Sequence, residues 1–342
     1  MNRNIMRAAL AVVLMAGGAL AQKVLINGTG ATFPYPMYSK WFDVYGKKYS
    51  NVQINYSSTG SGAGIQQVTV GTVDFGASDS PMSDTELKNF HDKNGYGVLH
   101  FPTVMGANVP AYKLAGVSQP LNFTGEALAG IFLGTITKWN DPAIAGANPG
   151  VNLPNGTIVV VHRSDASGTT FVWTDYLAKV SPEWKSKIGA GKAVNWPVGL
   201  GAKGSEGEAG QIQNTANSLG YVELTYALQN KMQYGKVKNA SGAFVMADLA
   251  SVTAAAAGAV KEMPDDFRVS ITNAPGKDSF PISTFTWLLI PEKIKDPTKK
   301  KAITDFLRWM LKEGQTQTQT LSYAPLPGAV VAKETKAIEK IQ

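Results

Sequence analysis

Residues 160–173, VVHRSDASGTTFVW, combine side chains that either bind an anion or attack a substrate. Arg163 carries a planar guanidinium that can donate two parallel hydrogen bonds to an oxyanion, and Asp165 follows closely enough to hold it in place. The next run, Ser167-Gly168-Thr169-Thr170, adds hydroxyl donors around a residue without a side chain. These residue types fit two kinds of site: a nucleophilic serine with its helpers, or a polar cradle for an anion.

A nucleophilic serine requires a general base within hydrogen-bond reach. The chain has three histidines, His91, His100 and His162, and no serine stands in a G-x-S-x-G elbow. A triad of Ser167 with His162 stays an alternative, in which an exported phosphatase or esterase would use Ser167 or Thr169 covalently. We expect no enzyme and no catalytic residue. Because cysteines and clustered histidines are missing from the sequence, we also expect no metal site and no cofactor.

The anion-cradle pattern occurs three times, at 28–33, 57–64 and 163–170, each time as a strand, a turn rich in Gly, Ser and Thr, and a helix start. The first amides of a helix lack intrahelical acceptors and lie at the positive end of its dipole, so they bind anions. Ordinary capping would explain any single turn. Three turns, one of them led by an arginine, favour binding. Ile65 replaces the third glycine of a dinucleotide fingerprint, so we expect no nucleotide.

Strand-like runs alternate with helical patterns, which predicts an α/β class. Apolar residues at helical spacing predict a helix through Tyr38, Trp41, Phe42 and Tyr45. The other expected elements are strands at 24–26, 52–56, 72–77, 157–161 and 285–290, helices from about 65, after a capping box at 83–86, at 250–260 and at 299–313, and a polar surface segment at 315–320.

The first residues have the pattern of a secretory signal. Arg3 and Arg7 precede an apolar run at 8–20 and an A-x-A cleavage site, which predicts a signal peptide at 1–21 cleaved near Ala21. That run is too short for a permanent membrane anchor, and no later segment comes close, so the mature protein is not membrane-embedded. Without a cysteine, lipoprotein attachment and disulfides are excluded, which suits a periplasmic protein stabilised by its core.

Length and charge add two limits. A chain of 342 residues, 44% of them hydrophobic, is long enough for two domains. The net charge of +7 includes Arg3 and Arg7 of the signal, and the lysines at 291–301 lie beside acidic residues. We interpret that run as a solvated helix start, and we expect no nucleic-acid partner.

Eight segments match, in order, those of a known family. The chain resembles the periplasmic solute-binding proteins of bacterial phosphate-specific ABC transporters. The likeness covers nearly the whole mature chain, although 235–280 matches less well. The matching segments are GATFPYPMYSKW (30–41), TGSGAGI (59–65), TVDFGASDSPMSD (72–84), FPTVMGA (101–107), IFLGTITKWNDPAI (131–144), RSDASGTTFVW (163–173), WPVGLGAKG (196–204) and LGYVELTYA (219–227).

This resemblance implies a two-lobed α/β fold of type II, whose lobes are joined by two crossing hinge strands near 101–104 and 281–284. Lobe 1 would comprise 22–102 plus 284–342, and lobe 2 would comprise 103–283. It also implies high-affinity binding of inorganic phosphate in the periplasm, as a monomer, and delivery to the permease subunits of a phosphate ABC transporter.

The resemblance further implies a set of phosphate-binding residues from both lobes, in which Asp165 braces Arg163. Phe33 and Gly168 would act through their backbone amides, and Ala166 stands where the family often has glycine. The set is Thr32, Phe33, Ser61, Asp79, Arg163, Ser167, Gly168 and Thr169.

Asp79 is the residue that bears on specificity, because a carboxylate repels an anion unless that anion has a proton to donate. Phosphate has such a proton at neutral pH and sulfate does not, so Asp79 would accept a P–OH hydrogen bond and penalise sulfate. A receptor for sulfate or molybdate is the alternative that Asp79 disfavours.

Overall fold

The computed structural model describes residues 23–260 and 263–342, so the signal peptide expected at 1–21 lies outside the described residues. Its strands are β1 (Val24–Gly30), β2 (Val52–Ser58), β3 (Phe75–Ser78), β4 (Val98–Lys113), β5 (Asn122–Phe123), β6 (Val159–Arg163), β7 (Leu200–Ala202), β8 (Ser218–Glu223), β9 (Gln233–Tyr234), β10 (Lys236–Lys238), β11 (Phe244–Val245) and β12 (Ser283–Pro291).

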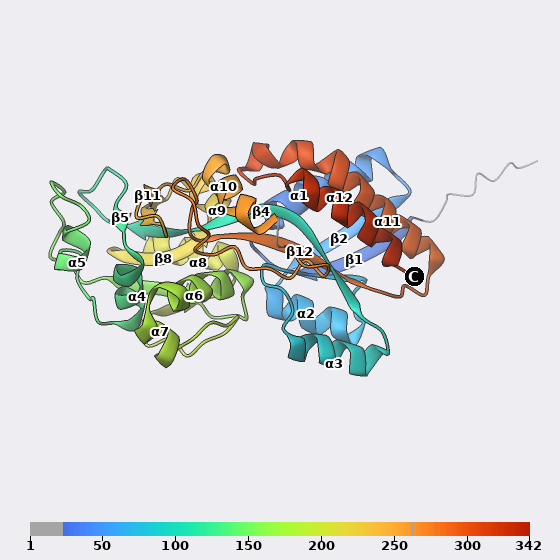
Figure 1. Ribbon diagram of the computed structural model, residues 1–342, viewed down its shortest axis with the longest axis horizontal. Helices are drawn as coiled ribbons and strands as arrows, with labels where there is room; N and C mark the ends of the chain where they lie inside the picture. Colours follow the sequence, from blue (N-terminus) through green and yellow to red (C-terminus); the bar gives the residue numbers. More distant parts are fainter. Residues whose placement is uncertain (1–22, 261–262) are drawn as a thin grey trace, which may run out of the picture.

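The helices cover both faces of the resulting sheet system (Figure 1). They are α1 (Tyr35–Lys48), α2 (Ser61–Val70), α3 (Asp84–Asn94), α4 (Gly125–Leu133), α5 (Pro142–Ala145), α6 (Gly168–Val180), α7 (Pro182–Lys187), α8 (Gly204–Asn214), α9 (Leu224–Gln229), α10 (Leu249–Ala259), α11 (Pro297–Lys312) and α12 (Gly328–Ala337), with the 3-10 helices η2 (Gly314–Leu321) and η3 (Ile338–Lys340).

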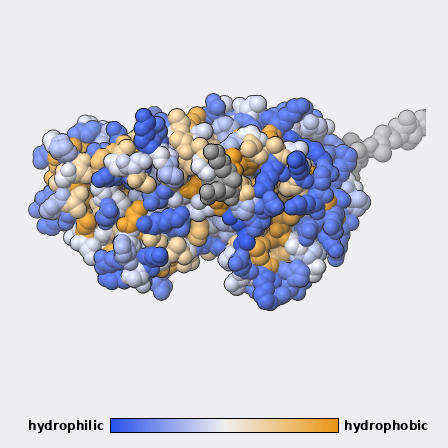
Figure 2. All heavy atoms as spheres, viewed as in Figure 1, coloured by the Kyte–Doolittle hydropathy of each residue, from blue (hydrophilic) through white to orange (hydrophobic). Residues whose placement is uncertain are grey.

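The large sheet runs in the order β2-β1-β3-β12-β4-β8-β6-β7, with β9 also paired to β4, and β11-β10-β5 form a small separate sheet. The strand β4 connects the two parts of this large sheet, because it pairs antiparallel with β12 as far as Ala107 and with β8 from Asn108 onward. Figure 1 shows β4 and β12 passing between two halves of the molecule. Figure 2 shows a notch in the outline between these halves.

Each half contains parallel strands whose carboxyl ends meet at one edge. In the first half β1 pairs parallel with β2 and β3, and in the second β6 pairs parallel with β7 and β8. Ligands of such sheets bind beyond the carboxyl ends of the strands, where the loops enter the helices. The three predicted cradles follow β1, β2 and β6, so all three lie at such ends.

The predicted apolar face of the first helix is confirmed. In α1, Tyr38, Trp41, Phe42 and Tyr45 are buried. The Phe42 and Tyr45 rings pack on Phe306 of α11 with centroids 5.4 and 5.2 Å apart. These contacts fix α1, and therefore the turn before it, against the rest of the first half.

Three expectations about local structure were wrong. The helix α2 begins at Ser61 rather than near Ile65, because Gly60 has a φ of 99° that lets the chain turn directly into the helix. The strand β3 begins only at Phe75. The polar segment 315–320 is not simply on the surface: it forms η2, Gln315 Nε2 donates to the Thr103 carbonyl over 2.9 Å, and Thr318 is buried.

Within residues 23–260 and 263–342, no helix has the length and apolar character needed to cross a bilayer. In the same part of the chain, histidine and acidic side chains form no cluster that could hold a metal ion.

Candidate anion-binding site

The turn between β1 and α1 places Thr32 and Phe33 inside the protein. Gly30 makes this possible: its φ is 141°, and a Cβ there would lie 2.1 Å from the Ala77 carbonyl oxygen. Thr32 and Phe33 are both at most 2% exposed. Their carbonyls accept hydrogen bonds of 2.7 Å from the hydroxyls of Tyr226 and Tyr323. The backbone of this turn is therefore held by distant segments.

Ser61 is the first residue of α2 and contacts Asp79 just beyond β3. The Ser61 hydroxyl accepts from the Asp79 amide over 3.2 Å and lies 3.5 Å from the Asp79 Oδ2 atom. Both residues are at most 1% exposed. The second predicted cradle therefore contacts Asp79, the residue expected to accept the P–OH hydrogen bond.

The Asp79 carboxyl is buried among hydroxyl groups. Thr286 Oγ1 of β12 donates to Asp79 Oδ1 over 3.0 Å, and Thr169 Oγ1 lies 3.5 Å from Oδ2. Burial raises the pKa of Asp79 to about 7, although the Thr286 hydrogen bond and the charge of Arg163 act in the opposite direction. At neutral pH this carboxyl can therefore either accept or carry a proton.

The third cradle begins with the ion pair of Arg163 and Asp165. Arg163 Nε donates to Asp165 Oδ1 over 2.8 Å and Nη2 to Oδ2 over 2.5 Å, which is a two-point contact. Burial by itself would raise the pKa of Asp165, but the hydrogen bonds and charge of Arg163 outweigh it and lower the pKa. Because Asp165 occupies Nε and Nη2, Nη1 remains for other partners.

Ser167, the N-cap of α6, follows two residues after Asp165. The Ser167 hydroxyl accepts from the Thr170 amide over 3.2 Å, as an N-cap does. A hydroxyl that accepts a hydrogen bond still has its own hydrogen to donate. At Gly168 a Cβ would lie 2.6 Å from Ser61 Oγ and 2.7 Å from Asp79 Cβ, so only glycine fits there.

The structure therefore brings the predicted residues of both halves together. Thr169 Oγ1 lies 3.5 Å from both Asp79 Oδ2 and Arg163 Nη1 and so bridges a carboxyl and a guanidinium. Gly62 of the first half also donates its amide to the Ala166 carbonyl over 2.9 Å. The replacement of the family's glycine by Ala166 leaves this contact in place.

The sequence interpretation missed a further turn, between β7 and α8. Ser205 Oγ lies 3.4 Å from Arg163 Nη1 and 2.7 Å from Thr32 Oγ1, and the Gly204 amide donates to Asp165 over 3.0 Å. The run 200–205, LGAKGS, has the same strand, small-residue turn and helix start as the other cradles. That pattern could have identified it, whereas Thr286 of β12 had no comparable signal.

A second buried acid on α8 adds to the electrostatics around Arg163. Glu208 is fully buried. Burial raises the pKa of Glu208 well above its usual range, and the positive charge of Arg163 opposes that shift. Asp165, which makes the direct two-point contact with Arg163, acts on the pKa of Arg163 more strongly than Glu208 does.

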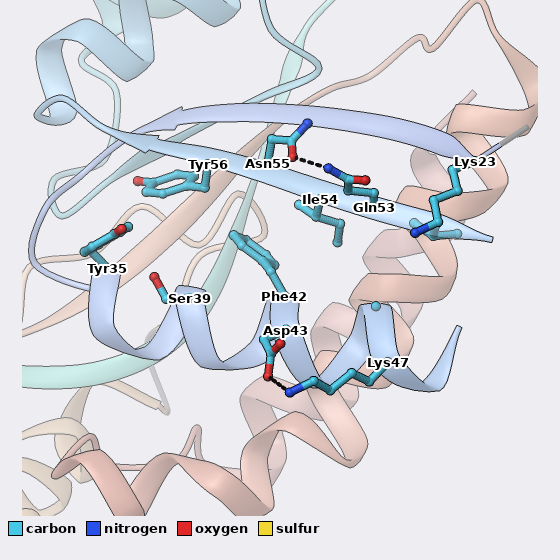
Figure 3. Close-up of a pocket in the computed structure, with 12 residues that line it drawn as sticks. Lys23, Tyr35, Ser39, Phe42, Asp43, Lys47, Gln53, Ile54, Asn55 and Tyr56 are labelled. Carbon is cyan, nitrogen blue, oxygen red and sulfur yellow. Dashed lines mark hydrogen bonds and ion pairs between the residues drawn. The ribbon is translucent and has the colours of Figure 1, made fainter. Parts of the chain in front are cut away.

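A pocket of about 430 Å³ lies elsewhere, between α1 and the edge strand β2 (Figure 3). Its lining residues include none of the predicted site residues. Within it Asp43 is already paired with Lys47 over 2.7 Å, and Gln53 donates to Asn55 over 3.0 Å. These paired surface groups offer no set of converging donors like that around Arg163.

Comparison with known proteins identifies the family of this chain. The family model of the PBP superfamily domain matches residues 17–313. A protein of Pasteurella multocida named phosphate-binding protein PstS is 45% identical over 96% of this chain and 94% of its own. One of the same name from Xylella fastidiosa strain Temecula1 is 47% identical over 91% of this chain and 84% of its own. The chain belongs to the PstS family.

A solved structure shares the fold of this PstS family member. It is a high-affinity periplasmic phosphate-binding protein bound with phosphate, and it aligns with a TM-score of 0.72 at 23% identity over 92% of this chain and 93% of its own. The fold is accordingly the two-lobed α/β arrangement predicted from the sequence. The PstS relatives are named as binding proteins rather than as enzymes.

Proposed function

We propose that this protein binds inorganic phosphate with high affinity in the periplasm and delivers it to the permease subunits of a phosphate ABC transporter. The observation that carries the proposal is the buried Asp79 carboxyl, surrounded by hydroxyl donors and within the electrostatic reach of Arg163. This combination suits an anion that also carries a proton. The names and titles of the PstS relatives and of the phosphate-bound neighbour support the same ligand.

In this proposal every predicted phosphate-binding residue except Asp79 donates to phosphate oxygens, and Asp165 supports Arg163 without contacting phosphate. Thr32, Ser61, Ser167 and Thr169 donate through hydroxyls, and Phe33 and Gly168 through amides. Arg163 supplies the positive charge, and Asp165 holds its guanidinium in one orientation. Asp79 accepts the P–OH hydrogen bond. Donors near the start of a helix need no reorganisation when the anion arrives, because they are already fixed.

Asp79 also accounts for discrimination against sulfate and molybdate. An anion without a proton would place its oxygen against an ionised carboxylate inside a buried site, where repulsion is weakly screened. The carboxyl would then have to take up a proton at a cost set by the pH. Phosphate avoids this cost because it supplies the proton itself.

We further propose that the chain moves as two lobes, 22–102 plus 284–342 and 103–283, about β4 and β12. The predicted hinge positions near 101–104 and 281–284 fall in or beside these paired strands. With this division, Thr32, Ser61 and Asp79 lie on one lobe and the Arg163 segment on the other. Phosphate would favour the closed arrangement because it contacts both lobes at once.

The location and assembly are part of the same proposal. A signal peptide at 1–21, cleaved near Ala21, would export the chain, and the mature protein would act as a monomer that meets the permease transiently. The absence of cysteine in the sequence is compatible with folding in the periplasm without disulfides.

Calorimetry on residues 22–342 tests the proposal. The protein is first unfolded and refolded to remove bound phosphate, then titrated with phosphate and with sulfate at neutral pH. We expect tight one-to-one phosphate binding and no heat from sulfate. Binding of both anions would contradict the role of Asp79 and favour a general oxyanion receptor. Folded protein that binds neither, but releases product from a phosphomonoester, would indicate an enzyme instead.

A further inference from the structure

Ser205, at the start of α8, is not one of the predicted binding residues, yet it contacts one of them, Thr32. It is 1% exposed and belongs to the second half, yet its partner is Thr32 of the first half. The two hydroxyl oxygens are 2.7 Å apart, and the Ser205 amide also donates to Thr32 Oγ1 over 3.2 Å. Thr32 thus has two contacts with a single residue across the site.

The direction of these hydrogen bonds follows from Arg163. Its Nη1 can only donate, so Ser205 Oγ, 3.4 Å away, must be the acceptor. The hydrogen of Ser205 is then available for Thr32 Oγ1. A chain of donors that starts at a cation polarises each following hydroxyl in the same sense, which favours donation from Ser205 to Thr32 over the reverse.

This order decides what the Thr32 hydroxyl can do. Its oxygen has two acceptor positions, and the Ser205 amide and hydroxyl fill both. Its own hydrogen is then left for a ligand. With the reverse order, Thr32 would donate to Ser205, and the anion would face lone pairs instead of a hydrogen.

We propose that Ser205 is a positioning residue that relays the polarisation of Arg163 to Thr32 and makes the Thr32 hydroxyl a donor to bound phosphate. The inference rests on the proposed function, and it adds a residue outside the expected binding set. Because the contact joins the two halves, it also links the orientation of this donor to their closure. Tyr226 supports the same arrangement, since its hydroxyl donates to the Thr32 carbonyl over 2.7 Å.

A double-mutant cycle of Ser205→Ala and Thr32→Val tests the relay by phosphate affinity in refolded residues 22–342. Ser205→Ala keeps the backbone amide and should weaken phosphate binding about tenfold, as expected for a hydrogen bond in a charged network. In the Thr32→Val background the same change should cost less than about twofold, because the group it acts through is gone. Ser218→Ala, which removes another buried serine hydroxyl of the second half, is the matched control and should not change affinity.

A second readout follows the proton itself. In protein loaded with phosphate, the Thr32 hydroxyl hydrogen should show a scalar coupling to the phosphate phosphorus by NMR, and Ser205→Ala should remove or weaken that signal.

Equal losses in both backgrounds, or a Thr32–phosphorus coupling unchanged by Ser205→Ala, would overturn the relay while leaving phosphate binding intact. Wild-type protein that is folded but binds no phosphate would instead overturn the proposed function, and the relay with it. Urea unfolding of each ligand-free variant separates a loss of affinity from a loss of fold.

Discussion

Two carboxyls of the site, Asp79 and Asp165, differ in almost every respect except residue type. Asp165 accepts from Arg163 at both oxygens and from the Gly204 amide, and its pKa is lowered. Asp79 is the more deeply buried, its nearest partners are hydroxyls, and its pKa is raised to about 7. One carboxylate has a lowered pKa, is ionised at neutral pH and orients a cation, whereas the other can change protonation with the ligand.

The comparison extends to the two sides of the site. The side built from β1, β2 and β3 contains hydroxyls, helix amides and a carboxyl of variable charge. The side built from β6 and β7 contains a guanidinium whose orientation is fixed by a local ion pair. Charge attraction and proton recognition therefore come from different halves, and they are coupled because the charge of Arg163 lowers the pKa of Asp79.

The largest effect is expected from Arg163→Ala. It removes the cation and leaves Asp165 buried without its partner, so phosphate affinity should fall about a thousandfold, or ~4 kcal/mol. Titration calorimetry measures the loss. Arg308→Ala, which removes a surface partner of Glu339, is the control and should bind as wild type does. Near-native affinity of Arg163→Ala would place the anion elsewhere.

Asp79→Asn should act on specificity rather than on attraction. The amide no longer repels an unprotonated anion, so the ratio of sulfate to phosphate dissociation constants should shrink while phosphate still binds, by about tenfold at pH 8, where Asp79 is mostly ionised. Asp165→Asn is the matched comparison. It weakens the ion pair that orients Arg163, so the binding of phosphate and the binding of sulfate should weaken to a similar degree. If Asp79→Asn leaves the ratio unchanged, the proton-recognition role of Asp79 is wrong.

The pH dependence of sulfate binding separates the two carboxyls further. Sulfate gains no proton between pH 5 and 8, whereas Asp79, with its pKa near 7, becomes neutral as the pH falls. Sulfate affinity of the wild type should therefore fall as the pH rises above 7, by at most about tenfold per pH unit for one proton taken up, and should level off below about pH 7, where Asp79 is already protonated. Asp79→Asn should flatten this slope, measured by calorimetry in non-binding buffers. A slope that persists in Asp79→Asn would assign the proton to another group.

The smallest effect is expected from the ion pair of Lys192 and Glu86, which joins the two halves over 2.8 Å beside the site. The Lys192 carbonyl accepts from the Ser167 amide, so this lysine is attached to the third cradle. Both side chains are partly exposed, at 17% and 25%, and solvent screening limits the gain. Lys192→Met should raise the phosphate dissociation rate about two- to fivefold with little change in association.

Stopped-flow measurements at two salt concentrations check this last prediction. Lys88→Met, which removes the exposed pair with Asp92 on the same helix as Glu86, is the control and should leave both rates unchanged. A faster dissociation in both variants would point to a general loss of positive charge rather than to the contact between halves.

Much of the fold could be predicted from local patterns. The apolar face of α1, the capping box that opens α3 and the buried strand before Arg163 all follow from spacing within a few residues, and the structure has them. Boundaries were less secure: the start of α2 at Ser61 depends on the backbone angles of Gly60 and on packing against β1 and β3. Likewise, η2 is held by Gln315, which donates to the distant Thr103 carbonyl and accepts from the Leu326 amide.

By itself, the sequence determined the class of ligand site. It contains an arginine with a nearby aspartate, three small-residue turns before helices, and a second aspartate, Asp79, just after the strand expected at 72–77; these residue types restrict the chemistry whatever their exact positions. Only the tertiary structure decided which groups meet. The roles of Thr286 and Ser205 depend on contacts between segments more than 150 residues apart. The raised pKa of Asp79 depends on burial that the whole fold creates. Neither these long-range contacts nor this burial can be predicted from a local sequence pattern, because both depend on segments far apart in the chain.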